Sequence, residues 1–132
     1  MKMKKIVAIL VLFLGLVVYA PSQSEAAHEY LCNIPSAKCY VDTDTIKKWD
    51  RWVMYADVIT VNYYDQQYRN RYEITVMNRD GRCYWAFRCK QFGHDLHRIS
   101  YKNASGYLRD YLVNKYGFAP EDRNGNPLNP VD

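Results

Sequence analysis

The chain has 132 residues, of which 48% are hydrophobic and 24% are charged, and its formal net charge is +4. This length fits one domain and excludes two full domains or a large α/β barrel enzyme. The hydrophobic content, with 15% aromatic residues, excludes a disordered chain, which needs few apolar residues and a high net charge. The basic excess is too small to indicate nucleic-acid binding, which needs Lys and Arg clustered on one face.

Residues 1–26 have the pattern of a cleavable export signal. Three lysines within the first five residues precede an uncharged apolar run at 6–18, and small residues follow at 24–27. The apolar run is shorter than the about 20 residues that span a bilayer, so we expect cleavage near Ala26 and no stable membrane insertion afterwards. Removal takes three of the 18 basic residues and one of the 14 acidic residues, which lowers the net charge from +4 to about +2. We therefore predict a secreted, periplasmic or cell-surface protein.

Two strands are predicted in the first half of the mature chain. Residues 39–42 form a short strand that ends in a capped turn at 43–46. Residues 52–64 are rich in β-branched and aromatic side chains, which is typical of a long strand. Residues 65–69 would connect this strand to the next one.

A β-hairpin is the clearest local prediction. Strands at 70–77 and 82–89 flank an Asp80-Gly81 turn, and an Asp-Gly pair favours a two-residue turn in which both residues have positive φ. This turn fixes the register, with an apolar face and a mainly polar face. The opposed pairs are Val76–Trp85, Ile74–Phe87 and Tyr72–Cys89 on the apolar face, and Glu73–Arg88 and Thr75–Ala86 on the other.

One helix is predicted over residues 105–116. Ser105 can cap its N-terminus, and Gly117 can end it. Strands followed by a helix indicate an α+β fold, with an antiparallel sheet of about four to six strands and one C-terminal helix packed on one face. The apolar stripe of the helix consists of Leu108, Tyr111, Leu112 and Tyr116.

The last segment, 119–132, is rich in Pro, Asn and Asp and nearly free of large apolar side chains. Such a segment buries too little surface to offset the entropy of ordering it. We therefore predict a flexible C-terminal tail at 119–132 and a secreted domain at 27–118.

Four cysteines lie in the predicted mature chain, and an even number in a short exported protein indicates two disulfides. Cys83 and Cys89 fall on one predicted strand, roughly 20 Å apart, so they cannot pair with each other. We expect Cys32 and Cys39 each to bridge to one of them, and the sequence leaves open which pairs with which. A zinc site is the alternative, but the cysteine spacings fit no common zinc finger.

Two groups of residues could carry chemistry. His94 and His97 could share a metal ion with Asp95, but they are more simply solvated loop histidines. Small exported ribonucleases place a glutamate, an arginine and a histidine on one sheet face, which Glu73, Arg88 and either histidine could imitate. An ordinary cross-strand ion pair between Glu73 and Arg88 is the simpler interpretation. We predict no metal, no cofactor and no catalytic residues.

Tyrosine is frequent, with 13 in the chain. Tyr63, Tyr64 and Tyr68 are followed closely by Arg69 and Arg71, and both residue types are enriched where proteins bind proteins. The alternative is that these tyrosines cover the sheet and pack in the core, because the two uses look alike in a sequence. We predict that these five residues, at a strand end and a loop, contact a protein partner.

The segment Cys-Tyr-Val-Asp-Thr-Asp-Thr-Ile at 39–46, followed by Trp-Val-Met-Tyr-Ala-Asp-Val at 52–58, resembles the opening of the surface-adhesin protein E-like family. In that family a Tyr-x-Asp-Thr-x-x-Ile turn precedes a strand, and the later hairpin is similar too, so the resemblance covers about residues 38–117. It implies an exported α+β domain without cofactor or catalytic residues. Some members bind host matrix and plasma proteins such as vitronectin, laminin and plasminogen. The alternatives are an envelope or periplasmic accessory protein without a host partner and a small secreted ribonuclease-like enzyme.

Overall fold

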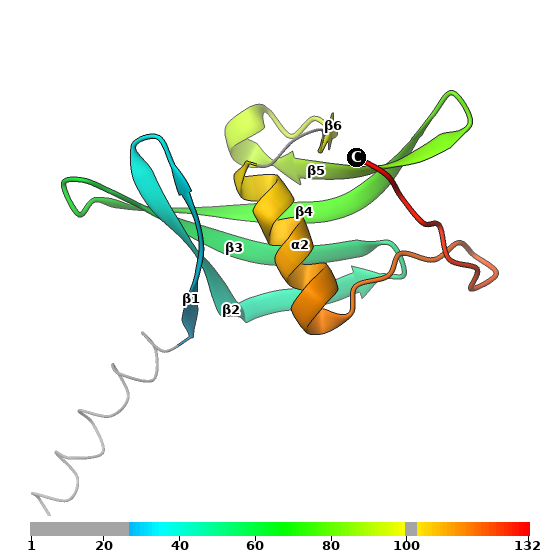
Figure 1. The fold of residues 1–132 in the computed structure, drawn as a ribbon, viewed down its shortest axis with the longest axis horizontal. Coiled ribbons are helices and arrows are strands. Elements are labelled where there is room, and N and C mark those ends of the chain that lie inside the picture. Colours follow the sequence, from blue (N-terminus) through cyan, green and yellow to red (C-terminus); the bar gives the residue numbers. More distant parts are fainter. Residues whose placement is uncertain (1–26, 100–102) are drawn as a thin grey trace, which may run out of the picture.

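The computed structural model describes residues 27–99 and 103–132. It contains a six-stranded antiparallel sheet in which each strand pairs with the next one in the chain, and a C-terminal helix lies across one face (Figure 1). The predicted α+β fold is therefore confirmed. The elements are β1 (His28–Ile34), β2 (Ala37–Asp50), β3 (Val53–Asn62), β4 (Gln67–Arg79), β5 (Arg82–Cys89), the 3-10 helix η1 (Lys90–Phe92), β6 (His97–Arg98) and α2 (Ala104–Tyr116).

The predicted export signal at 1–26 lies outside the described residues. Among the residues that are described, no helix is long and apolar enough to cross a membrane. The first described strand, β1, pairs with β2.

The predicted hairpin is confirmed together with its register. β4 and β5 bring together all five predicted residue pairs. At the turn, Asp80 and Gly81 have φ angles of 53° and 78°, so both adopt the left-handed conformation that the turn requires. Glu73 and Arg88 form the predicted cross-strand ion pair, with Arg88 Nη1 3.4 Å from Glu73 Oε2.

The N-terminal half contains more strand than predicted. β2 continues through residues 43–46, which the sequence predicts to be a turn at the end of a short strand. The turn-forming side chains produce a bulge instead. Thr45 Oγ1 donates to the Asp42 carbonyl (2.7 Å) and accepts from the Asp57 N–H (2.8 Å). The register shifts after Asp42, and pairing with β3 resumes at Lys47.

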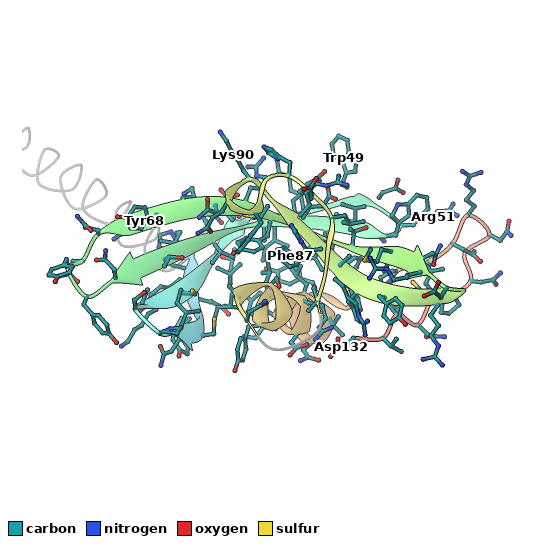
Figure 2. The ribbon with its side chains drawn as sticks, turned by 90° about the horizontal axis from the view of Figure 1, so that it is seen from above. Trp49, Arg51, Tyr68, Phe87, Lys90 and Asp132 are labelled. Atoms are coloured by element: carbon teal, nitrogen blue, oxygen red, sulfur yellow. The ribbon has the colours of Figure 1, made fainter. Side chains whose placement is uncertain are left out.

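The core lies between the sheet and α2. Two residues of the predicted helical stripe, Leu108 and Leu112, are completely buried, whereas Tyr116 at the end of the stripe is 47% exposed. Figure 2 shows α2 on one side of the sheet and Trp49 on the other. The sheet therefore has a helix-covered face, which contains the main core, and an outer face.

α2 begins one residue earlier than predicted because Asn103, and not Ser105, caps it. Asn103 Oδ1 accepts from the Gly106 N–H (3.1 Å) and from the Ser105 hydroxyl. Gly117 ends the helix as predicted, with a φ of 63°.

Replacing Asn103 with alanine is expected to lower the free energy of unfolding by about 1 kcal/mol, because the first turn of α2 loses its acceptor. Ser105→Ala is the matched control and should cost less, since it leaves the Asn103–Gly106 hydrogen bond intact. Urea denaturation measures both effects. An equal or larger loss for Ser105→Ala would show that the Asn103 side chain is not the main cap.

Residues 119–132, predicted to be a flexible tail, are instead bonded to the rest of the fold: Glu121 and Arg123 bond Arg51 in the β2–β3 turn, and the last two residues lie against β5 and α2 (Figure 1). The Trp85 N–H donates to the Val131 carbonyl (2.9 Å), and Val131 forms a parallel bridge to β5. The Asp132 carboxylate pairs with the buried guanidinium of Arg109. The prediction considered only the low apolar content of this segment, whereas backbone hydrogen bonds and an ion pair hold it in place. The predicted domain boundary at 118 is corrected accordingly.

Candidate functional site

β3 and β4 are joined by residues 62–66, which we call the tyrosine turn. Asn62 organises it: its Oδ1 accepts from the Tyr64 N–H (2.9 Å) and the Gln66 N–H (3.0 Å), and its Nδ2 donates to Gln66 Oε1 (2.8 Å). Asp65 adopts a φ of 59°, which aspartate tolerates better than most residues. These hydrogen bonds within the turn fix its shape.

The tyrosine turn presents its aromatic side chains to solvent. Tyr63 is 82% exposed and Tyr64 is 86% exposed, so neither belongs to the core. The tips of the β1–β2 and β3–β4 hairpins project from the same end of the sheet (Figure 1). Between them lies an open pocket of about 430 Å³, whose walls include Tyr63, Lys38 and Tyr40.

The five predicted contact residues do not form one surface. Tyr68, Arg69 and Arg71 belong to β4, which begins at Gln67, so successive side chains point to opposite faces. Tyr68 is about half exposed and lines a pocket on the helix-covered face. The two arginines lie on the outer face, where they contact acidic residues of β2 and β3.

Arg69 and Arg71 belong to what we call the arginine–aspartate network. Arg69 Nη1 lies 2.7 Å from Asp42 Oδ2 and 3.0 Å from Asp57 Oδ2, and Arg71 Nε lies 3.0 Å from Asp57 Oδ1. Asp42 and Asp57 are buried and directly opposed on β2 and β3. Hydrogen bonds to the two carboxylates raise the pKa of Arg69. A cation between two buried carboxylates offsets their repulsion, so Arg69 stabilises the fold.

The residues of the ribonuclease alternative are not brought together. Glu73 and Arg88 lie on the outer face of the sheet. His97 is paired with Phe87, and the two rings lie 5.6 Å apart on the helix-covered face. His94 lies in the turn before β6, with a φ of 63°. In the part of the chain that the structure describes, no group of three or more His, Cys, Asp or Glu residues could hold a metal ion.

The cysteines are arranged differently from the prediction. All four are unbonded thiols. Cys32 on β1 is directly opposite Cys39 on β2, whereas Cys83 and Cys89 lie on β5. β3 and β4 lie between β2 and β5, so β2 and β5 are three strand spacings, or about 14 Å, apart across the sheet. A disulfide needs Cα atoms within about 7 Å. The predicted bridges from the N-terminal cysteines to the hairpin are therefore incompatible with this fold.

Sequence reasoning missed Trp49 as a surface residue. Its side chain is largely exposed on the outer face, and its ring meets that of Tyr55 edge-on at 6.0 Å. With Arg71, these rings border an open pocket of about 480 Å³. The alternation of side chains along a strand could have placed Trp49 on the outer face. That inference needs β2 to continue past residues 43–46, where the sequence analysis predicted a turn.

Comparisons of the chain with protein-family models, with curated proteins and with solved structures give no match. The likeness to the adhesin family consequently rests on the residues between 38 and 117. The geometry of the tyrosine turn is the main basis on which a function can be proposed.

Proposed function

We propose that this protein is an exported, non-catalytic binding domain that contacts a host matrix or plasma protein through the tyrosine turn. The observation that carries the proposal is the exposure of Tyr63 and Tyr64 on a turn fixed by Asn62. Tyrosine brings a large contact area and a polar hydroxyl at low entropy cost. A turn that already has a fixed shape also loses less conformational freedom on binding.

The pocket beside Tyr63 supports a protein partner in particular. Its lining includes the aromatic residue Tyr40, the basic residue Lys38 and the acidic residue Asp65, so it suits a side chain with polar and apolar parts. The class of partner comes from the resemblance to adhesins that bind vitronectin, laminin and plasminogen. The rival function is an envelope or periplasmic accessory protein without a host partner.

Replacing Tyr63 and Tyr64 together with alanine is expected to weaken binding at least ~10-fold and to leave the melting temperature nearly unchanged. Interface tyrosines that become buried cost about 2 kcal/mol or more when truncated, and about 1.4 kcal/mol corresponds to tenfold in affinity. The measurement is saturable binding of the purified protein to immobilised vitronectin, laminin and plasminogen, at low and physiological salt.

Tyr116→Ala is the matched control, because it removes an exposed tyrosine from α2, outside the tyrosine turn. It should leave the affinity unchanged. Wild-type binding that disappears at physiological salt would be weak charge attraction and would contradict the proposal. Binding to none of the three proteins would favour the accessory function, and binding unaffected by the double substitution would place the contact elsewhere.

A further inference from the structure

We propose that Cys32 and Cys39 form a disulfide across the β1–β2 hairpin, made by exchange with a small disulfide that enters a pocket ending at Cys39. The two cysteines are directly opposed in the register of the hairpin, and both side chains are buried on the helix-covered face. Opposed residues on antiparallel strands have Cα atoms about 4.5–5.5 Å apart, which lies within the roughly 4.4–6.8 Å range of disulfides. The backbone therefore already has the spacing that the bond requires.

A pocket of about 250 Å³ lies against Cys39, whose side chain is fully buried, so a small disulfide in the pocket reaches the Cys39 sulfur when the pocket wall opens. Its walls include Cys39 but not Cys32. The other described lining residues include aromatic residues such as Tyr68 together with Asn70 and Gln91, whose carboxamides hydrogen-bond each other, and none of these described residues is charged. An uncharged small disulfide matches such a lining, because carboxamides can bond its polar ends and aromatic rings can cover its carbon atoms.

The surroundings of the two thiols make Cys39 the attacking group. The Cys32 thiol hydrogen-bonds the Cys39 sulfur, and the Thr60 hydroxyl lies 3.9 Å from the same sulfur. These contacts stabilise a thiolate at Cys39, so they lower the pKa of Cys39, whereas the contact between the two thiols raises the pKa of Cys32. The thiolate is the nucleophile in disulfide exchange.

The exchange takes two steps. The Cys39 thiolate attacks one sulfur of the small disulfide RSSR, the S–S bond breaks, and the departing thiolate takes up the proton released by Cys39 to give RSH. The Cys32 sulfur then attacks the Cys39 sulfur of the mixed disulfide, and its proton passes to the second departing RS⁻. Overall, the two protein thiols lose two hydrogen atoms and are oxidised, while RSSR is reduced to two RSH.

The remaining cysteines lie further from Cys39 than Cys32, its hydrogen-bond partner, does. Cys89 is buried beside Tyr72 on β5, which is separated from β2 by two strands. Cys83 lies six residues further along the same strand, roughly 20 Å away at the strand rise. Both should keep their thiols when Cys32 and Cys39 are joined.

The test treats the reduced protein with 2-hydroxyethyl disulfide and maps its peptides without reduction by mass spectrometry. We expect a peptide that joins Cys32 to Cys39, with a mass lower by two hydrogen atoms. Cys32→Ser should stop at a mixed disulfide on Cys39, because the second attacking thiol is gone. Cys83→Ser is the matched control and should form the Cys32–Cys39 bond as the wild type does.

A bond between Cys39 and Cys89, or a folded wild-type protein in which Cys32 and Cys39 stay reduced, would overturn the proposal. So would a mixed disulfide on Cys32 in preference to Cys39 when the reaction is stopped early. Near-ultraviolet circular dichroism of the same samples reports whether each variant is folded. The wild-type peptide map decides the question even if Cys32→Ser does not fold, and it does not depend on whether the tyrosine turn binds a partner.

Discussion

Replacing Arg69 with alanine is expected to lower the free energy of unfolding by about 3 kcal/mol, although 48% of this side chain is exposed. The substitution leaves the carboxylates of Asp42 and Asp57 opposed and buried without the cation that contacts both of them. Removing one partner of a buried ion pair typically costs about 3–5 kcal/mol, and the exposure of the arginine places the effect at the lower end. Urea denaturation at neutral pH measures the loss.

Arg71→Ala is the matched control. Its side chain is 67% exposed and its guanidinium contacts Asp57 alone, so the loss should stay below about 1 kcal/mol. Adding Asp42→Asn to the Arg69→Ala protein should restore part of its stability, because a neutral amide removes the repulsion between the two carboxylates. Equal losses for the two arginines, or a further loss from Asp42→Asn, would show that repulsion between the aspartates does not drive the effect.

The placement of these arginines shows where sequence reasoning stops. Both were predicted to share a binding surface with the neighbouring tyrosines, because tyrosine and arginine are enriched where proteins bind proteins. β4 begins at Gln67, so Tyr68 and Arg69 point to opposite faces. The acidic partners Asp42 and Asp57 come from strands that are distant in the sequence, and no local pattern indicates such a pairing.

Elements with strong local signals could be predicted well. The Asp80-Gly81 turn fixes the whole β4–β5 register, and Gly117 ends α2 as predicted, because each depends on a few adjacent residues. β1 has no comparable signal, and its pairing with β2 places Cys32 opposite Cys39. The predicted pairing of Cys32 and Cys39 with the cysteines of β5 did not take the β1–β2 hairpin into account.

The exposure of the tyrosine turn could be predicted only as one of two possibilities. Tyrosine packs in cores and at interfaces alike, so composition did not decide between them. Asn62 decides it, since its side chain closes the turn and leaves the adjacent Tyr63 and Tyr64 outside the sheet. An asparagine that precedes two tyrosines and Asp65 is the sequence signal for this geometry.

The second large effect is expected in the core, where Leu112→Ala should lower the free energy of unfolding by about 3 kcal/mol. Leu112 is completely buried between α2 and the sheet, and its truncation loses apolar burial and leaves a cavity. Tyr116→Ala tests the same predicted stripe one turn later, where the side chain is 47% exposed. That substitution should cost less than about 1 kcal/mol. Urea denaturation of the two variants compares them directly.

The comparison between these two variants separates helix periodicity from tertiary packing. Periodicity alone assigns Leu112 and Tyr116 to one face and predicts similar losses, because they are four residues apart on α2. The structure predicts a clear difference, since the sheet lies under Leu112 while Tyr116, at the end of the helix, contacts the Tyr111 ring. Similar losses would mean that the C-terminal end of α2 packs on the sheet more closely than the structure places it. A loss confined to Leu112→Ala would show that helix–sheet packing at the centre of α2 holds the fold together.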